Sequence, residues 1–468
     1  MSGNFWSDRV VREALGIGGR ASDAPYATIS TDTRSISAGD LFVALKGDQF
    51  DGHTFLEAAA AAGATGAVVS EMPETAPAGM KVYQVEDTLT ALGRLAHHKR
   101  KQMKARVIAV VGSNGKTTTK ELIRAVLSTR FQTYATKGNL NNQIGVPLTL
   151  LGIPDDAEAV VVEMGTDRPG EIALLSAIVK PEMVVITSIG EEHLEHLVDL
   201  EGVLLEEVSV FEGLAPEGKA FVAGEPDVLP RKARELIGRN RVKVVGLGES
   251  AEIRPDGGDR GVKVLEDGST LWRWRGVEVR LPIPGRFNVR NALLALGVGL
   301  ELGIPSQEAV RALATVTLPK LRGEWLQYGD LRVLADCYNA NPPSLMAAVE
   351  LLGSLPTRGR RIAVLGSMRE LGPTSDQLHT TAADKIAKML NDRLDMIVAT
   401  GAFVKPFERH RDKIGKQVVL AQDAVDAYEA VRGELRPTDT ILLKASRGEQ
   451  LERWLPLLEK DFGPAKQV

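Results

Sequence analysis

The sequence is poor in the features that mark secreted and membrane-spanning proteins. Among 468 residues there is one cysteine, Cys337, so no disulfide can form within the chain. This suits a reducing compartment, although a secreted protein without disulfides would share the trait. The first eight residues lack the basic and then apolar stretches of a signal peptide, and no apolar run approaches the roughly 20 residues of a spanning helix. We therefore expect a cytoplasmic protein.

The chain also lacks an excess of either charge. With 57 basic and 61 acidic residues, its net charge of -4 gives no electrostatic reason to expect nucleic acid or a membrane surface as a partner. A locally basic pocket for an anionic ligand is compatible with this balance. The 44% hydrophobic and 25% charged fractions are those of an ordinary soluble globular protein. We expect a monomer that binds neither nucleic acid nor a membrane.

Strand and helix patterns alternate along the chain and predict an α/β fold with three domains, at 1–103, 104–318 and 319–468. The first is a smaller α/β domain, which ends in a basic helix end (97–101) that we interpret as solvated. The second has a central parallel sheet of the phosphate-loop type. The third is a Rossmann-like doubly wound domain without G-x-G-x-x-G after its first strand, so a dinucleotide site is not expected. Strands are predicted at Leu41–Leu45, Gly66–Val69, Val82–Val85, Arg106–Val111, Ala159–Val162, Met183–Thr187, Ala220–Val222, Val242–Val245, Arg332–Ala335, Arg361–Leu365, Met396–Thr400, Gln417–Leu420 and Thr440–Leu443.

A phosphate-binding loop is the firmest motif of the chain. The apolar run Arg106–Val111 is typical of a buried parallel strand, and Gly112-Ser113-Asn114-Gly115-Lys116-Thr117 follows it and opens a helix. In this context backbone N–H groups bind phosphate, Lys116 neutralises it, and the Thr117 hydroxyl binds Mg²⁺. Val110 replaces the first glycine of the general pattern. The alternative, a plain glycine turn, does not explain Lys-Thr at the helix start.

Two candidate metal-binding segments follow other predicted strands of the second domain. Glu163 follows one strand, at the sheet edge where α/β proteins bind ligands. It is either a magnesium ligand or, alternatively, a charge at a helix N-terminus or a solvated loop acid. The stretch 190–196 contains a His-x-x-His spacing, at His193 and His196. Zinc is disfavoured because no cysteine or third spaced histidine accompanies it. His193 is therefore a candidate ligand of a second magnesium ion, with solvated helix charges as the alternative.

Motifs in all three segments, in the expected order, resemble the Mur ligase family. The most diagnostic is Asp336–Pro342, whose D-x-Y-N-A-N-P pattern is similar to the branch that adds D-Ala-D-Ala to UDP-MurNAc-tripeptide. Relatives that form the tripeptide tend to carry a histidine there. The stretches 31–34, 39–45 and 51–53 resemble the family's UDP-sugar-binding end, and 138–147 and 444–447 resemble further motifs of the same branch. The resemblance covers nearly the whole chain.

The resemblance assigns roles residue by residue. ATP would be bound by Gly112, Ser113, Asn114, Gly115, Lys116, Thr117, Thr118, Asn291, Arg322 and Asp336. UDP-MurNAc-tripeptide and D-Ala-D-Ala would be contacted by Thr33, Arg34, Asn139, Asn141, Asn142, Asn339, Asn341, Lys444 and Arg447. Catalysis would rest on Lys116, Glu163, His193, Glu207 and Arg322. Mg²⁺ would be bound by Thr117, Glu163, His193 and Glu207.

Three positions depart from the family's pattern. Glu207 stands where members usually have a carbamylated lysine that binds the second Mg²⁺, and no lysine occurs between Lys180 and Lys219. Our hypothesis is that Glu207 substitutes for it. Glu206 is the alternative in register, and a surface acid beside a weakened metal site is the alternative in function. Ser367 replaces a common aspartate, and Leu321 replaces a common glycine.

The resemblance implies an ATP-dependent amide ligase that works through an acyl phosphate in peptidoglycan synthesis. One alternative is a relative that adds a different amine, of the MurE type, against which the Asp336–Pro342 motif argues. A second is a nucleotide-binding regulatory protein that has lost catalysis, as Glu207 and Ser367 suggest. A P-loop kinase or GTPase-like switch ranks last, because the first glycine is absent and no N-K-x-D-type stretch is found.

Overall fold

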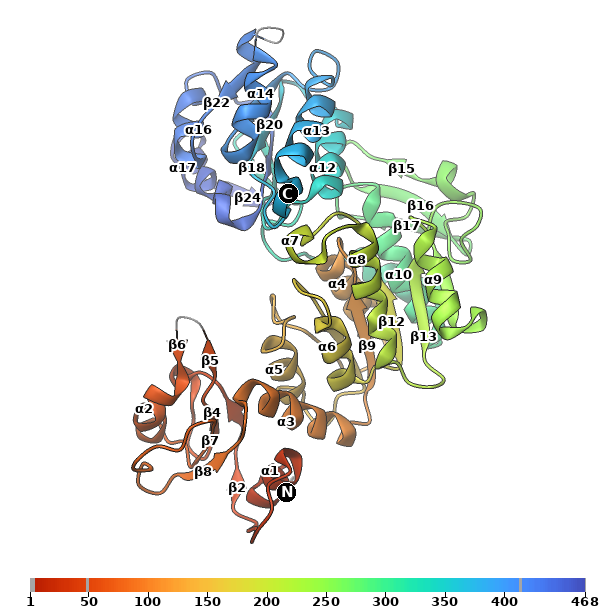
Figure 1. Cartoon of the computed structure of the whole chain (residues 1–468). Coiled ribbons are helices and arrows are strands. Elements are labelled where there is room, and N and C mark those ends of the chain that lie inside the picture. Colours follow the sequence, from red (N-terminus) through yellow and green to blue (C-terminus); the bar gives the residue numbers. More distant parts are fainter. Residues whose placement is uncertain (1–4, 48–49, 412–414, 468) are drawn as a thin grey trace.

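The computed structural model describes residues 5–47, 50–411 and 415–467. It shows three α/β units in chain order, with the N-terminal unit at one end of the molecule and the C-terminal unit at the other (Figure 1). Each unit is built around a parallel or mostly parallel sheet. The predicted fold class is confirmed. None of the helices in the described ranges is long and apolar enough to cross a membrane.

The N-terminal unit is the smallest. Its four parallel strands lie in the order β3-β4-β7-β8, at Ile29–Ser30, Leu41–Val43, Gly66–Val69 and Lys81–Gln84. Two-stranded antiparallel pairs flank this sheet, β1-β2 (Trp6–Ser7, Pro25–Tyr26) and β5-β6 (Lys46–Gly47, Phe50–Asp51). Helices α1 (Asp8–Leu15) and α2 (Leu56–Ala61) pack with the sheet, and α3 (Thr88–Gln102) leads to the next unit.

The central unit contains six parallel strands in the order β10-β11-β9-β12-β13-β14. They lie at Thr133–Ala135, Ala159–Glu163, Arg106–Val111, Met183–Ile186, Lys219–Ala223 and Val242–Val245. Alternate residues of β9 face opposite sides: Val107 and Val111 enter one apolar cluster, whereas Ile108 and Val110 enter another. Because both faces must be covered, the strands are apolar throughout rather than alternating.

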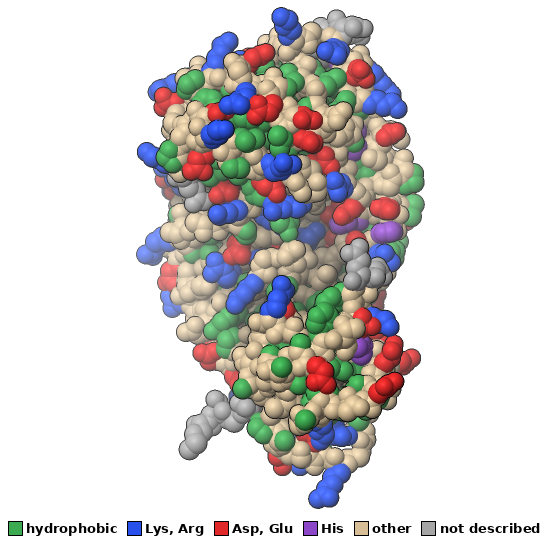
Figure 2. Space-filling view, turned by 90° about the vertical axis from the view of Figure 1, so that its left-hand side faces the viewer, with side chains coloured by type: hydrophobic (Ala, Val, Ile, Leu, Met, Phe, Trp, Pro, Cys, Tyr) green, Lys and Arg blue, Asp and Glu red, His purple; other side chains and the backbone are tan. Residues whose placement is uncertain are grey.

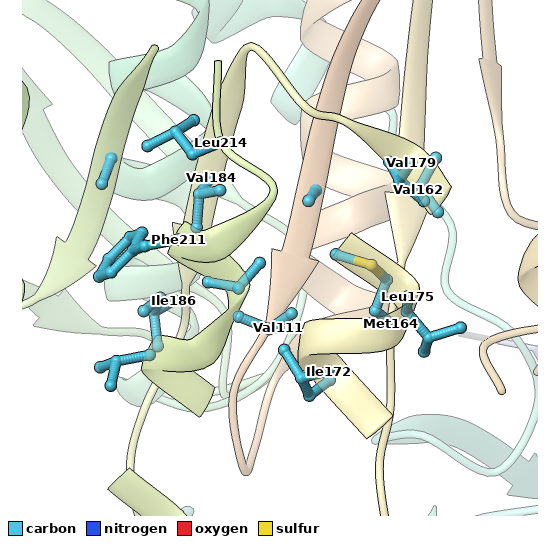
Figure 3. Packing of buried hydrophobic residues seen from close by; sticks show 14 of the residues in the cluster. Val111, Val162, Met164, Ile172, Leu175, Val179, Val184, Ile186, Phe211 and Leu214 are labelled. Carbon is cyan, nitrogen blue, oxygen red and sulfur yellow. The ribbon is translucent and has the colours of Figure 1, made fainter. Parts of the chain in front are cut away.

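Helices cover both faces of the central sheet. One face carries α5 (Gly145–Leu151), α6 (Glu171–Val179), α8 (Leu200–Val208) and α9 (Val228–Ile237). Figure 3 shows this side, where Ile172 and Leu175 of α6 pack with strand residues such as Val111. The other face carries α4 (Lys116–Leu127), α10 (Phe287–Glu301) and α11 (Ser306–Leu313). The fully buried valine-rich strands therefore hold the phosphate loop, which follows β9, on a rigid base.

A three-stranded antiparallel sheet, β15-β16-β17, lies within the central segment and was not predicted. Its strands are Lys263–Val264, Thr270–Trp274 and Val277–Leu281. Trp272 and Trp274 alternate with more exposed neighbours and enter the same cluster as α10. The signal for this strand is the alternation of Trp272 and Trp274 with polar residues, which indicates a half-buried strand.

The C-terminal unit has seven strands in the order β22-β21-β20-β23-β19-β18-β24. They lie at Val418–Leu420, Met396–Ala399, Arg361–Leu365, Thr440–Lys444, Leu331–Asp336, Glu324–Tyr328 and Ala465–Gln467. The five predicted strands are confirmed, and β18 and β24 form an additional antiparallel edge. The helices include α12 (Pro342–Ser354), α13 (Ser375–Ala387), α14 (Val404–Glu408), α16 (Ala424–Val431) and α17 (Trp454–Phe462).

The basic end of α3 is only partly solvated: Lys101 is exposed, but the prediction was wrong for Lys99 and Arg100. Lys99 and Arg100 are buried against the central unit. Lys99 Nζ donates to the carbonyls of Leu151 (2.9 Å) and Ile153 (2.6 Å). Arg100 donates to Val179 O (2.8 Å) and Lys180 O (3.0 Å) at the end of α6, and to Glu182 (2.6 Å). Unpaired carbonyls at helix ends attract cations, so these two side chains join two units instead of facing water.

Candidate active site

The phosphate loop joins β9 to α4 through two glycines that no other residue could replace without movement. Gly112 has φ 119°, and a Cβ there would collide with Thr187. Gly115 caps α4 with φ 84°, and a Cβ would lie 2.8 Å from Asn291 Oδ1. Both conformations lie in the region that favours glycine. The loop is thus free of side-chain bulk where a phosphate would approach the N-terminus of α4.

Hydrogen bonds hold this loop against the segment after β12. The Ser113 N–H donates to Ser188 O (3.0 Å), and the Asn114 N–H donates to Ser188 Oγ (2.8 Å). Ser113 Oγ in turn accepts from the Gly190 N–H (2.8 Å). The predicted loop 112–118 is therefore a single ordered turn. Its position is fixed before any ligand binds, which lowers the entropy cost of binding.

Lys116 lies at the centre of the site's charges. Its side chain is 15% exposed, and Nζ donates to Gly112 O (2.5 Å) and lies 3.7 Å from Glu192 Oε2. Burial alone would lower the pKa of Lys116, but the carboxylates of Glu192, Glu207 and Glu163 outweigh it and raise that pKa. The ammonium is therefore held as a cation at the mouth of the phosphate loop.

Glu163 and Thr117 meet as the sequence predicted, and Glu163 is not a solvated acid. Thr117 Oγ1 donates to Glu163 Oε1 at 3.2 Å, and Asn141 Nδ2 donates to the same oxygen at 3.0 Å. Glu163 is 1% exposed, and its Oε2 is buried without a hydrogen-bond partner, 3.7 Å from Lys120 Nζ. An orphaned carboxylate oxygen beside a threonine hydroxyl fits a hard cation such as Mg²⁺.

Within the described ranges, no three His, Cys, Asp or Glu side chains converge as a ready-made metal site. Mg²⁺ usually takes one or two carboxylates and completes its shell with phosphate oxygens and waters. Thr117 and Glu163 match that smaller demand, because the nucleotide would supply the other oxygens. The residues present therefore fit Mg²⁺ bound together with a nucleotide, rather than a metal held by the protein alone.

His193 links the central unit to the C-terminal unit. Its Nδ1 lies 2.7 Å from Glu370 Oε2, an ion-pair distance at angles outside hydrogen-bond geometry, and its Nε2 lies 3.8 Å from Glu192 Oε2. Although burial opposes it, the carboxylates of Glu370 and Glu192 raise the pKa of His193. The contact lowers the pKa of Glu370. The structure pairs His193 with these acids and not with Glu207.

Glu207 and Glu206 differ sharply, although they are adjacent on α8. Glu206 accepts the N–H groups of Gly170 (2.6 Å) and Ile172 (2.8 Å) at the start of α6, so it serves as a helix cap. Glu207 is 1% exposed, and its Oε2 is buried without a hydrogen-bond partner. Burial raises the pKa of Glu207 to about 8, although Lys116 opposes the shift. The interpretation of Glu207 as a surface acid is therefore wrong.

Arg322 lies in the segment that connects the central and C-terminal units. Its guanidinium stacks over Tyr338 at 3.9 Å from the ring centroid, and it adds positive charge near Lys116. Leu321, at the position of the family's common glycine, has φ 64° and is nevertheless buried. Gly323 also has a positive φ, 70°. The connection thus contains two left-handed residues around Arg322, and the leucine is held there by packing.

The ion pair of Asp336 and Lys444 forms the C-terminal wall. Lys444 Nζ donates to Asp336 Oδ2 (2.8 Å) and to Asn339 O (2.8 Å), and Lys444 is 2% exposed. Asn341 caps α12 through a capping box with Ser344, which is a structural role. The cleft is lined by Asn339 and by Arg447, which pairs with Glu452 at 3.3 Å. Lys444 and Asn341 thus shape this wall.

Ser367 and Asn291 also have defined partners. Ser367 Oγ accepts the N–H of Ala402 at 2.9 Å, a bond that an aspartate could make equally well, so this departure leaves the local fold intact. Asn291 donates to Asn288 Oδ1 at 2.8 Å and lies behind Gly115. The pair Asn288 and Asn291 therefore supports the phosphate loop from α10 instead of capping the helix.

One large cavity of about 1050 Å³ brings most of the predicted residues together, between the central and C-terminal units. Its lining includes Ser113, Asn114, Gly115, Lys116, Thr117, Thr118, Asn139, Asn141, Asn142, Glu163, His193, Asn291, Arg322, Asp336, Asn339, Lys444 and Arg447. Three of the predicted loop, metal and acceptor residues, Gly112, Glu207 and Asn341, are not part of this lining, although Glu207 lies close to Lys116 and to the Gly112 backbone. Most of the predicted loop, metal and acceptor residues thus form one site.

Thr33 and Arg34 lie elsewhere, in a cavity of about 510 Å³ on the N-terminal unit. Arg34 pairs with Asp32 (2.6 Å). Phe50 and Phe55 stack there with ring centroids 5.0 Å apart and remain exposed. Exposed stacked aromatics suit a planar ring as ligand.

The sequence interpretation missed Glu192, Glu370 and the pair Phe50 and Phe55 as site residues. Glu192 lies beside His193 in the same acidic run, so its position next to the predicted ligand was the available signal. Phe50 and Phe55 flank the 51–53 motif. Glu370 comes from a distant segment, and nothing local in the sequence places it against His193.

The surface carries mixed charges. On the face seen in Figure 2, basic and acidic side chains are interspersed over the C-terminal unit, and no large patch of one sign is visible. The balanced net charge therefore does not conceal a one-sign field on that face.

The fold and the site define a nucleotide-binding α/β enzyme whose phosphate loop faces a separate C-terminal unit across the cavity. Family models match in three consecutive parts: the Mur ligase family catalytic domain at 25–100, the Mur ligase middle domain at 110–299, and the Mur ligase glutamate ligase domain at 321–447. The chain belongs to the Mur ligase family and is an ATP-dependent ligase. The resemblance seen in the sequence is confirmed.

Relatives and solved structures agree with this assignment. The chain is 36% identical over 432 residues to the UDP-N-acetylmuramoyl-tripeptide–D-alanyl-D-alanine ligase of Bacillus subtilis, covering 91% of each chain. It is 35% identical to the Escherichia coli ligase of the same name, covering 94% of this chain and 96% of that one. A crystal structure of MurF from Acinetobacter baumannii matches with a TM-score of 0.86 and 29% identity, covering 97% and 99%. MurF ligase from Thermotoga maritima in complex with ADP matches at 0.79 and 26%, covering 93% and 97%.

Proposed function

We propose that this chain adds D-Ala-D-Ala to UDP-MurNAc-tripeptide, with ATP as energy source, and so makes a pentapeptide precursor of peptidoglycan in the cytoplasm. One observation supports this most strongly. The phosphate loop, the Thr117–Glu163 pair and Arg322 line the same cavity as three residues of the D-x-Y-N-A-N-P motif, namely Asp336, Tyr338 and Asn339. Relatives that carry this activity in their names are similar over 91% and 94% of this chain.

The reaction proceeds in two steps, phosphoryl transfer and then attack by the amine. The γ-phosphoryl group of ATP passes to the terminal carboxylate of the tripeptide, which gives ADP and an acyl phosphate. The amine of D-Ala-D-Ala then attacks the acyl carbon, loses a proton, and phosphate leaves. Since a carboxylate and a triphosphate repel each other, the site must neutralise charge. Lys116 and Arg322 provide the neutralising positive charge. Each such donor lowers the activation barrier by about 2.7–4 kcal/mol.

Magnesium would be held by Thr117 and Glu163 at the phosphate loop, and by His193 and Glu207 at a second position. When bound, it neutralises the phosphate charge that develops during transfer. Metal binding would displace the proton that burial favours on Glu207, and the carboxylate would then supply the negative charge that the family's carbamylated lysine would supply. The orphaned Glu207 Oε2 supports this role, because a buried carboxylate oxygen with no partner is costly unless a cation or donor comes to it.

The remaining substrate groups would be distributed along the molecule. The N-terminal cavity around Thr33 and Arg34 would hold the UDP end, with a nucleobase against Phe50 and Phe55. Asn139, Asn141 and Asn142 would contact the peptide, and Asn339 and Arg447 the acceptor. This division corresponds to the predicted domains at 1–103, 104–318 and 319–468. We propose a monomer.

An assay of ADP release separates this function from its rivals. Purified protein is given ATP, Mg²⁺ and UDP-MurNAc-tripeptide, with and without D-Ala-D-Ala. Turnover only with both substrates supports the proposal. Turnover with another amine in place of D-Ala-D-Ala would support the MurE-type alternative, and hydrolysis without substrate, or none at all, would favour the regulatory alternative.

A further inference from the structure

A loop of the C-terminal unit reaches across to the central unit and meets His193. This loop (366–372) follows β20 and carries Glu370, whose Oε2 lies 2.7 Å from His193 Nδ1. The backbone joins as well, because the Glu195 N–H donates to Glu370 O at 3.3 Å. Gly372 permits the approach: its φ is 55°, and a Cβ there would lie 2.7 Å from Glu195 Cα. Two backbones are thus in contact across the boundary between the units.

Both residues of this contact have unfavourable backbone conformations. His193 has φ 50° and Glu370 has φ 65°, and neither is glycine. A left-handed conformation costs roughly 1–2 kcal/mol per non-glycine residue. Such strain persists only where the surroundings fix it, and it is concentrated at functional sites. Eight non-glycine residues of the described chain have a positive φ, and two of them, His193 and Glu370, meet at this contact. This coincidence points to a selected contact.

The Glu370 loop is braced from its own unit. The Arg369 N–H donates to Ser446 Oγ (3.0 Å), and the Arg369 side chain pairs with Glu449 (3.0 Å). The Met368 N–H donates to His379 Nε2 (2.9 Å). Since these bonds all lie within the C-terminal unit, Glu370 moves with that unit. Its carboxylate can reach His193 only when the unit is in this position.

The contact also decides which way the imidazole faces. With Nδ1 against Glu370, Nε2 points toward Glu192, 3.8 Å away, and hence toward Lys116 and the phosphate loop. Metal-binding histidines typically give their other ring nitrogen to a carboxylate, which fixes the ring and raises its basicity. Here the carboxylate lies 2.7 Å from Nδ1 as an ion pair outside hydrogen-bond geometry, and it comes from the unit on the far side of the cleft.

We propose that Glu370 is a positioning residue that makes metal binding at His193 depend on closure of the C-terminal unit. The inference rests on the proposed role of His193 as a magnesium ligand. Closure would then strengthen binding of metal with ATP, and metal with ATP would favour closure by the same factor, because coupling between two sites is reciprocal. Phosphoryl transfer would be confined to the closed enzyme.

Binding of Mn²⁺, measured by electron paramagnetic resonance in the presence of a non-hydrolysable ATP analogue, tests this directly without turnover. Glu370→Ala removes the carboxylate and keeps a non-glycine residue at the strained position. It should weaken Mn²⁺ binding by about 10- to 100-fold, as loss of a carboxylate behind a metal-bound histidine does. Glu370→Gln keeps the length of the side chain but removes its charge. It should reduce Mn²⁺ affinity less than Glu370→Ala does.

Two further variants make the result decisive. Asp376→Asn removes an exposed carboxylate from the same unit, six residues from Glu370, and should bind Mn²⁺ as the unchanged protein does. His193→Ala should weaken binding at least as much as Glu370→Ala. If only Glu370→Ala binds normally, the positioning role is wrong. If His193→Ala binds normally, the metal role of His193 is wrong and the positioning role with it. An equal loss with Asp376→Asn would show a general charge effect and overturn the inference.

Discussion

The two junctions of the molecule differ in kind. At the first, α3 is tied to the central unit by buried Lys99 and Arg100, whose hydrogen bonds satisfy helix-end carbonyls. At the second, the central and C-terminal units meet across the cavity of about 1050 Å³, through His193 and Glu370 and through strained backbone. The first junction is closed by buried hydrogen bonds, whereas the second surrounds a cavity. In the proposed function, the first would keep the UDP end in place while the C-terminal unit closes over ATP at the second.

The largest expected effect is at the phosphate loop, in the cavity of the second junction. Lys116→Met removes the cation at the phosphate loop and should lower turnover by about 100- to 1000-fold, as loss of one transition-state donor does. Steady-state ADP release measures it, and circular dichroism checks that the fold is kept. Turnover within tenfold of the unchanged protein would remove Lys116 from catalysis.

Glu207 should give the next largest effect. Glu207→Ala removes the proposed ligand of the second magnesium and should lower activity by about 10- to 100-fold. Glu207→Lys, assayed with bicarbonate so that the lysine can be carbamylated, should restore part of it. The adjacent Glu206→Gln is the matched control, because Glu206 caps α6 and should affect stability more than turnover. Full activity in Glu207→Ala would exclude Glu207 from the site.

The first junction should respond in stability instead. Arg100→Ala removes hydrogen bonds to two carbonyls and the ion pair with Glu182. The free energy of unfolding should fall by about 2–4 kcal/mol. This is less than the loss expected for a fully buried ion pair, because Glu182 is partly exposed. Urea denaturation measures the loss. Unchanged stability together with reduced turnover per folded molecule would contradict the division between the two junctions.

The smallest expected effect concerns His379, whose Nε2 accepts the Met368 N–H and so supports the loop that carries Glu370. His379 is buried, and burial lowers its pKa below the ordinary 6.5. Its Nδ1 faces Ser375 O (2.8 Å) and its Nε2 accepts the Met368 N–H, so the neutral ring fits and the charged ring loses a bond worth about 1 kcal/mol. The stabilising contribution is complete above pH 6.5 and is lost as the pH falls through the lowered pKa.

Urea denaturation between pH 7.5 and pH 5 checks this. The unchanged protein should lose stability as the pH falls, and His379→Gln, which keeps an acceptor but does not titrate, should show a flatter profile. Identical profiles would mean that His379 does not contribute to the pH dependence.

The sequence predicted most of the parallel framework, because fully buried strands are continuous apolar runs. Arg106–Val111, Arg361–Leu365 and Val242–Val245 have the predicted bounds. It failed where distant segments decide the outcome. The basic end of α3 resembled a solvated helix end, since only the packed structure reveals that carbonyls of α6 lie against Arg100.

For the candidate site, as for the fold, local motifs were predicted from the sequence and contacts between distant segments were not. Local motifs brought Thr117 and Glu163 together correctly, whereas Glu370 could not be linked to His193 from sequence. Leu321 shows how packing overrides a local rule. A left-handed leucine costs roughly 1–2 kcal/mol, but burying a leucine is worth a comparable or larger amount, so packing holds a residue where glycine would be expected.

Pulsed electron paramagnetic resonance distances test the contrast between the junctions most directly. Cys337 is buried and burial raises its thiol pKa to about 12, so spin labels would attach at introduced cysteines. The exposed positions Glu74, Glu235 and Glu408 represent the three units. Addition of a non-hydrolysable ATP analogue, Mg²⁺ and UDP-MurNAc-tripeptide should leave the 74–235 distance unchanged and should shift and narrow the 235–408 distance distribution. A shift in 74–235 as large as that in 235–408, or no shift in either, would contradict the account.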